Sequence, residues 1–163
     1  MVGRARTRGQ DGAIRAERVL FCCTMPAKNP TTDAIADFLA GTTYAVAGAS
    51  TNRAKYGNKV LRCYLQNGRT AYPINPRADV IEGVPCYPDL ASLPGPVHGL
   101  SIITPPAITE ELVEEAAAAG IPRLWMQPGA ESEEAIERAR ELGLAVIAGG
   151  PCLLVALGYR ERP

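Results

Sequence analysis

The sequence is poor in the side chains that hold metal ions. It has one histidine, His98, and its cysteines form no CxxC pair and no spacing typical of a zinc site. A His/Cys metal site is therefore not expected. An odd, scattered set of cysteines is typical of reduced thiols, which predicts a cytoplasmic protein. The five cysteines are Cys22, Cys23, Cys63, Cys86 and Cys152.

An excess of either charge is also missing, and so are long apolar runs. Lys plus Arg number 17 and Asp plus Glu number 17, so no global basic field exists to attract a nucleic acid or an anionic membrane. No apolar run reaches membrane-spanning length without a charge, a glycine or a proline. We therefore expect neither nucleic acid nor membrane as a partner. A ligand site with local positive charge is compatible with this balance.

Recognised catalytic motifs are absent as well. The sequence has no GxSxG elbow, no P-loop and no paired carboxylates at a predicted strand end. Cys152, which follows Gly149-Gly150-Pro151, is the best candidate for a nucleophile. Its only possible histidine partner, His98, precedes the predicted third strand and belongs near the opposite edge of the sheet. We therefore expect Cys152 to be a small packing residue and predict no catalytic residue.

Hydrophobic residues, in contrast, are abundant. They make up 47% of the 163 residues, which predicts one packed globular domain. The beginning of the chain differs, because arginines predominate there and apolar periodicity starts only at Val19. We expect residues 1–28 to be either a disordered extension or the product of a start upstream of a true first residue at Met25. Residues 29–163 are expected to form the domain.

Short apolar runs alternate with helical patterns along the rest of the chain. The predicted strands are 43–47, 70–74, 100–103, 123–126 and 144–147, and the predicted helices are 31–40, 56–67, 109–119 and 132–142. A short helical turn is expected over 89–93. This alternation predicts an α/β fold, a Rossmann-type doubly wound parallel five-stranded sheet with helices on both faces, in a single domain. In such sheets ligands bind beyond the carboxyl ends of the strands.

The turn after the first predicted strand has the composition of a phosphate site. Gly48 allows the backbone to approach a phosphate closely, and the start of the following helix offers amide donors. Ser50 adds a hydroxyl group, and Arg53 and Lys55 add positive charges. A plain strand-to-helix turn with solvated charges is the alternative. We favour phosphate binding, because small, hydroxyl and basic residues coincide there.

The turn after the second predicted strand argues against a nicotinamide dinucleotide. The GxGxxG fingerprint is absent, and Asn75 stands where an Asp or Glu would hold the ribose. Pro76 and Arg77 follow. Arg77 is suited to a phosphate on ribose, as in NADP or the 3′-phosphate of coenzyme A. It is equally compatible with an ordinary surface arginine.

The ordered set of these turns resembles the stand-alone coenzyme A-binding domain family, which is similar to the amino-terminal domain of the succinyl-CoA synthetase alpha subunit. The resemblance covers 43–152, and its marks are Val46-Ala47-Gly48-Ala49-Ser50, Lys55 to Gly57, Tyr72-Pro73-Ile74-Asn75-Pro76, Gly83, Tyr87, Trp125-Met126-Gln127-Pro128-Gly129-Ala130 and Cys152. Two departures stand out. Gly150-Pro151 precede Cys152 where the family commonly has Asp-Arg, and Ile103-Thr104 replace a common Phe-Arg.

The resemblance implies coenzyme A as the ligand. Gly48, Ala49 and Ser50 would cradle it, with Lys55 near a phosphate. Asn75 and Pro76 would line its nucleotide end. The neighbouring wall would be formed by Thr104 and Pro105.

Three functions are compatible with these observations. We favour a non-catalytic protein that binds coenzyme A or an acyl-CoA in a regulatory or carrier role. The second is an NADP-dependent oxidoreductase on a degenerate Rossmann domain. The third is an alpha-type subunit that completes an acyl-CoA ligase with a partner. The chain is accordingly expected to form either a homodimer or a complex with a partner subunit.

Overall fold

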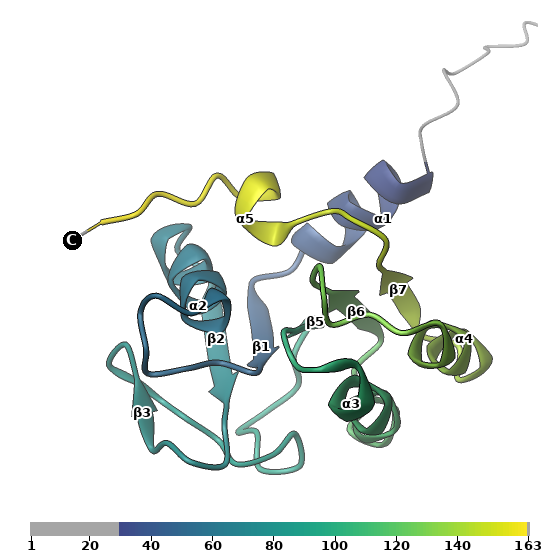
Figure 1. Cartoon of the computed structure of the whole chain (residues 1–163), viewed down its shortest axis with the longest axis horizontal. Helices are drawn as coiled ribbons and strands as arrows, with labels where there is room; N and C mark the ends of the chain where they lie inside the picture. Colours follow the sequence, from purple (N-terminus) through teal and green to yellow (C-terminus); the bar gives the residue numbers. More distant parts are fainter. Residues whose placement is uncertain (1–29, 163) are drawn as a thin grey trace, which may run out of the picture.

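Five parallel strands form the central sheet of the computed structural model, which describes residues 30–162 (Figure 1). Their order is β2-β1-β5-β6-β7. The strands are β1 (Thr43–Ala47), β2 (Thr70–Ile74), β5 (Gly99–Ile102), β6 (Arg123–Met126) and β7 (Ala145–Ile147). The predicted five-stranded parallel sheet is confirmed. The extension expected over residues 1–28 lies outside the described residues.

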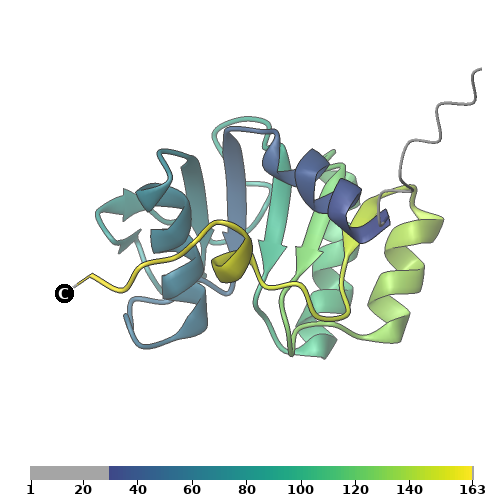
Figure 2. The same cartoon turned by 90° about the horizontal axis from the view of Figure 1, so that it is seen from above.

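Helices cover both faces of this sheet, as expected (Figure 2). One face packs against α1 (Pro30–Leu39), α2 (Tyr56–Gln66) and the short α5 (Leu153–Ala156). The other face packs against α3 (Pro106–Ala118) and α4 (Glu133–Glu141). β1 serves both cores, because its side chains alternate: Tyr44 and Val46 join the first core, and Ala45 and Ala47 join the second. Burial on both faces explains why this strand is a continuous apolar run.

Two helix starts follow from local chemistry. Ser132, the first residue of the predicted helix 132–142, caps α4, since its hydroxyl oxygen accepts a 3.0 Å hydrogen bond from the backbone N–H of Ala135. α3 begins at Pro106, earlier than the predicted residue 109. Proline is well suited to the first helical position, because the N–H that it lacks would have no partner within the helix.

Three short segments differ from the sequence-based expectation. A hairpin, β3 (Val80–Ile81) and β4 (Val84–Pro85), stands where only a turn-rich stretch was expected. Its turn places Glu82 and Gly83 at φ of 51° and 76°. The helix α5 was not predicted at all. The helical turn expected over 89–93 is shorter than predicted: it is a single turn in which the Leu93 N–H donates to the Leu90 carbonyl at 3.4 Å, and the Asp89 carboxylate accepts from the N–H and the hydroxyl of Ser92.

The largest side chain of the core lies on β6. Trp125 on β6 is fully buried, and its indole N–H donates a 3.0 Å hydrogen bond to the Pro151 carbonyl. This bond ties the segment before α5 to the sheet. No helix within 30–162 combines the length and the apolar character needed to cross a membrane.

Candidate functional site

A cavity of about 830 Å³ opens at the carboxyl ends of β1, β2 and β5. The chain leaves β1 toward α2 on one face of the sheet and leaves β5 toward α3 on the other face. This is the point where the strand order reverses, which is where open α/β sheets bind ligands. The lining includes Tyr56, Gly57, Ile74, Pro88, Asp89, Ile103, Ile108, Leu112 and Glu115.

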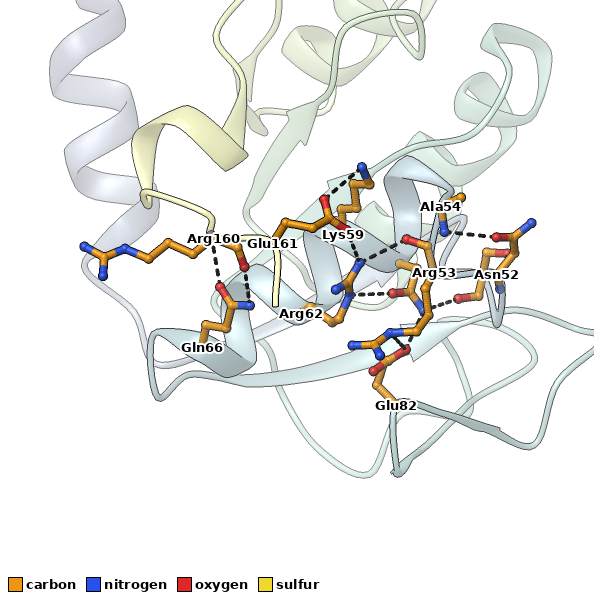
Figure 3. Close-up of polar contacts among 11 residues, drawn as sticks. Asn52, Arg53, Ala54, Lys59, Arg62, Gln66, Glu82, Arg160 and Glu161 are labelled. Carbon is orange, nitrogen blue, oxygen red and sulfur yellow. Dashed lines mark hydrogen bonds and ion pairs between the residues drawn. The ribbon is translucent and has the colours of Figure 1, made fainter. Parts of the chain in front are cut away.

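Most of the residues singled out from the sequence also line this cavity. They are Gly48, Ala49, Ser50, Lys55, Asn75, Pro76, Arg77, Thr104 and Pro105. Arg53 does not line it. Instead, the Arg53 Nε atom lies 3.3 Å from a carboxylate oxygen of Glu82 on the hairpin turn (Figure 3). The sequence could not indicate this pair, because Glu82 is remote along the chain and reaches Arg53 only through the hairpin.

The first turn is built on very close approaches of backbone. Gly48 has a φ of 84°, and a β-carbon on it would lie 2.4 Å from the carbonyl oxygen of Ile103. A β-carbon on Gly57 would lie 2.0 Å from the carbonyl oxygen of Gly48. The end of β1, the end of β5 and the start of α2 therefore meet with no room for a side chain. Gly57 was noted only as part of a motif, and its packing role was missed.

Local hydrogen bonds fix the rest of this turn. The Ser50 hydroxyl oxygen accepts from the Asn52 N–H at 3.2 Å, and the Asn52 side-chain oxygen accepts from the Ala54 N–H at 2.9 Å. The buried Asn58 amide donates to the Ser50 carbonyl at 2.8 Å. The turn then enters α2, whose amino-terminal end carries a partial positive charge toward the cavity rim.

Two cations of the rim are left without a partner among the described residues. Lys55 and Arg77 are both exposed and line the cavity, and neither forms an ion pair with any residue of 30–162. Arg53 is paired with Glu82. The positive charge available at the cavity therefore comes from Lys55, Arg77 and the end of α2.

Asn75 joins two of the turns around the cavity. Its side-chain amide donates to the Ala49 carbonyl at 2.8 Å, and its side-chain oxygen accepts from the Arg77 N–H at 2.9 Å. These bonds occupy both ends of the side-chain amide. The structure therefore gives Asn75 a clear part in shaping the cavity wall.

The remaining wall combines apolar side chains with two carboxylates, those of Asp89 and Glu115. Ile108, at the start of α3, is 44% exposed although it is a large hydrophobic residue, and it lines the cavity beside Pro105. The hydroxyl oxygens of Thr104, which follows β5, and of Thr109 lie 2.9 Å apart, within hydrogen-bond distance. Exposed apolar surface of this kind suits the flat face of a base better than a phosphate. Ile108 was not singled out from the sequence, because the predicted helix began after it.

Cys152 takes part in a polar contact that the sequence did not reveal. Its sulfur lies 2.5 Å from the Tyr56 hydroxyl, which donates to the Gln127 side-chain oxygen at 3.2 Å. The same oxygen accepts from the Leu153 N–H at 3.0 Å, at the start of α5. Burial, and then the Cys152 contact, raise the pKa of Tyr56 well above its usual range.

Further catalytic or metal-binding groups are not apparent in the described part of the chain. A ring nitrogen of His98 lies 2.9 Å from the Asp37 carbonyl oxygen, at the α1 end of the molecule, and forms no contact with Cys152. No group of three or more His, Cys, Asp or Glu side chains within 30–162 is arranged to hold a metal ion. The thiols of Cys63, Cys86 and Cys152 are free.

The geometry agrees with a comparison to known protein families. The model of the CoA-binding domain family matches residues 42–158, which include every residue of the cavity. The chain belongs to this family. The expected resemblance is thereby confirmed, together with the Rossmann-type fold.

The chain is also similar to individual proteins. A conserved hypothetical protein from Pyrococcus furiosus is 39% identical, with a TM-score of 0.67, over 70% of this chain and 97% of that one. The ADP-forming acetate–CoA ligase I of Archaeoglobus fulgidus is 29% identical over 119 residues, which are 67% of this chain. The alpha subunit of the ADP-forming acetate–CoA ligase II of Pyrococcus furiosus is 25% identical over 114 residues, or 63% of this chain. The matches span only 17% and 25% of these two ligase chains.

Proposed function

We propose that this protein binds coenzyme A or an acyl-CoA in the cavity at the carboxyl ends of β1, β2 and β5, without catalysing a reaction itself. The observation that carries the proposal is the presence, in one cavity, of two cations without an ion-pair partner in residues 30–162, Lys55 and Arg77, and of apolar surface around Ile108. Coenzyme A carries phosphates at one part of the molecule and a flat base at another. Membership of the CoA-binding domain family supports the same ligand.

Each part of the ligand has a natural place in this cavity. The diphosphate would lie on the turn of Gly48, Ala49 and Ser50, near the amino-terminal end of α2. The 3′-phosphate would meet Arg77 or Lys55. The base would lie against Pro76, Thr104, Pro105 and Ile108. A direct contact from Arg53 would require its ion pair with Glu82 to open.

A carrier or regulatory role is the function we favour, in the cytoplasm that the cysteine content predicts. A second candidate is an alpha-type subunit that completes an acyl-CoA ligase with a partner. It is favoured by the similarity to the ligase alpha subunit of Pyrococcus furiosus. Val155 on α5, which is 82% exposed, offers an apolar contact for such a partner or for a second copy of the chain.

Calorimetric titration with four ligands tests the proposal. We expect coenzyme A to bind more tightly than NAD, since Asn75 replaces the acid that would hold the ribose of NAD. Dephospho-coenzyme A should bind more weakly than coenzyme A. Equal binding of NAD and coenzyme A would contradict the proposal, and a preference for NADP would favour the oxidoreductase.

The same titrations, made with an Arg77 variant, test which residue contacts the 3′-phosphate. If Arg77 holds this phosphate, Arg77→Ala weakens coenzyme A and leaves dephospho-coenzyme A unchanged. Arg140→Ala, which removes an exposed arginine from α4 on the other side of the fold, is the matched control. If Arg77→Ala weakens both ligands equally, the 3′-phosphate contact belongs to Lys55 or to another group.

A further inference from the structure

Arg62 on α2 is a buried arginine whose guanidinium group lies beneath the phosphate turn. Its side chain is about 6% exposed. Its Nε atom donates to the Asn58 side-chain oxygen at 2.8 Å, and an Nη atom donates to the Arg53 carbonyl at 3.0 Å (Figure 3). A buried charge is costly unless it is hydrogen-bonded and paired. The position of Arg62 is therefore determined by these partners.

The counter-charge comes from the end of the chain. A carboxylate oxygen of Glu161 lies 3.3 Å from Nη2 of Arg62, and the other carboxylate oxygen lies 3.1 Å from the Lys59 ammonium group. The hydrogen bonds from Lys59 and Arg62 lower the pKa of Glu161, so it is charged at neutral pH. The Tyr159 ring faces the guanidinium group at 5.4 Å.

Hydrogen bonds from a side chain of α2 to the backbone of this terminal segment hold the segment against the helix. The Gln66 side chain donates to the Arg160 carbonyl at 2.8 Å and accepts from the Arg160 N–H at 3.2 Å. Figure 3 shows these contacts and the Glu161 contacts along the same helix. Residues 159–161, which we term the C-terminal strap, thus lie along α2 and cover Arg62.

The hydrogen bonds of Arg62 also lead to the phosphate turn, residues 50–55, through Asn58. Asn58, which accepts from Arg62, donates to the Ser50 carbonyl at 2.8 Å and to Glu82 at 3.0 Å. The planar trans peptide links the direction of a carbonyl to that of the next N–H. The hydrogen bond from Asn58 to the Ser50 carbonyl therefore also fixes the Thr51 N–H, which points in the opposite direction. In the same way, the hydrogen bond from Arg62 to the Arg53 carbonyl fixes the Ala54 N–H.

From this chain of contacts we propose that Arg62 is a positioning residue for the phosphate turn, and that the C-terminal strap holds Arg62 in place. The strap would keep the turn of residues 50–55 in its ligand-receiving conformation before any ligand arrives. Preorganisation of this kind raises affinity, because the ordering of the turn is not left to the ligand. The effect on affinity rests on the proposed function, whereas the ordering of the turn does not.

Hydrogen exchange of the ligand-free protein tests the ordering. Glu161→Gln removes the charge of an exposed residue and keeps its shape, so the fold should survive. We expect the amides of residues 50–55 to exchange several-fold faster in this variant, while those of β6 keep their rates. Glu114→Gln, which removes an exposed ion pair with Arg138 between α3 and α4, is the matched control and should change neither segment.

Coenzyme A titration tests the consequence for binding. Arg62→Lys keeps the positive charge, but a lysine cannot donate hydrogen bonds to the Asn58 side chain and to the Arg53 carbonyl at the same time. We therefore expect about tenfold weaker binding of coenzyme A, which is about 1.4 kcal/mol. Glu161→Gln should also weaken binding, by a smaller factor. A purely structural role would lower the melting temperature and leave the affinity of the folded protein unchanged.

The outcomes separate the two proposals. If the wild-type protein does not bind coenzyme A, the proposed function fails, and the exchange rates of residues 50–55 still decide the positioning role. If Arg62→Lys does not fold, Glu161→Gln decides alone. Unchanged exchange of residues 50–55 in Glu161→Gln, or unchanged coenzyme A affinity in variants whose turn exchanges faster, would overturn the inference.

Discussion

Gly57 lies so close to Gly48 that a β-carbon on Gly57 would stand 2.0 Å from the Gly48 carbonyl oxygen. The contact joins the start of α2 to the end of β1. The sequence suggested that Gly48 must be small to admit a diphosphate. The structure adds a reason that holds without any ligand, because a Gly48 β-carbon would meet the Ile103 carbonyl oxygen at 2.4 Å.

We therefore expect Gly57→Ala to destabilise the fold itself. Backbone rather than a flexible side chain opposes the new methyl group, so the cost should be about 3 kcal/mol, as for overpacking that moves backbone. Urea unfolding of the ligand-free protein measures it. Gly95→Ala is the matched control, since Gly95, like Gly57, lies outside the left-handed φ region and has no atom within 4 Å of its β-carbon position. The control should change the stability by less than about 1 kcal/mol, and an equal loss in both variants would refute the steric explanation.

Lys55→Ala should weaken coenzyme A binding without affecting the fold. Lys55 is exposed and has no ion pair within residues 30–162, so its removal leaves no unpaired charge there. A charge-assisted contact with phosphate predicts a loss of about 1.5–3 kcal/mol. The loss should shrink in high salt, because salt screens an exposed contact. Titration at two salt concentrations measures both effects, and a salt-independent loss would argue against a phosphate contact.

The sheet and the residues of its rim could be predicted from the sequence because both depend on local patterns. An apolar run such as Thr43–Ala47, ended by Gly48, predicts a buried parallel strand. Parallel strands bring their carboxyl ends to one edge, so the residues after them share one cavity. This places Ser50, Asn75 and Thr104 together although they are distant along the chain.

The partners of individual side chains could not be predicted, because they depend on long-range geometry. Arg53 and Lys55 are equivalent candidates in the sequence, and only the hairpin that carries Glu82 separates them. That hairpin has two residues in each strand, too few for a strand pattern. The contact of Tyr56 with Cys152 likewise joins two residues that are far apart in the sequence.

Cys152→Ser should leave coenzyme A affinity unchanged within about twofold. Serine can replace the sulfur as a partner of the Tyr56 hydroxyl, and Cys152 itself does not line the cavity. Titration of the variant beside Lys55→Ala, under one salt condition, provides the comparison. If the cysteine change abolished binding while the lysine change had no effect, an enzymatic role for Cys152 would have to be reconsidered.

Cys63 should make the fold less stable at alkaline pH. Burial raises the pKa of this fully buried thiol from its usual 9.0 to about 11. The unfolded chain therefore loses the proton first, and the free energy of unfolding falls as the pH rises from 9 toward 11. Two pKa units correspond to about 2.7 kcal/mol. The raised pKa values of Tyr44 and Tyr64 add to this decline at higher pH.

Urea unfolding at pH 8 and pH 10.5 measures the decline. Cys63→Ala removes the thiol and should show a shallower fall between the two pH values, even though the new cavity lowers its stability at both. Alkylation of the native protein at pH 8 should spare Cys63 and reach it only after unfolding. A decline as steep in Cys63→Ala as in the wild type would show that other groups cause it.

The position of β1 in the sheet also affects the order in which its two edges can be paired during synthesis. β1 is paired with β2 on one side and with β5 on the other, and the second pairing begins between Tyr44 and Gly99. At ribosomal rates of about 5–20 residues per second, β5 follows β1 by roughly 3 to 11 seconds. Throughout that interval the growing chain offers one unpaired edge of β1, a strand that is buried on both faces in the finished fold, to chaperones and to other nascent chains. The interval ends when β5 emerges, and Ile103, Thr104 and Pro105 follow it immediately, so the stretch of synthesis that covers the second edge of β1 also supplies part of the cavity wall.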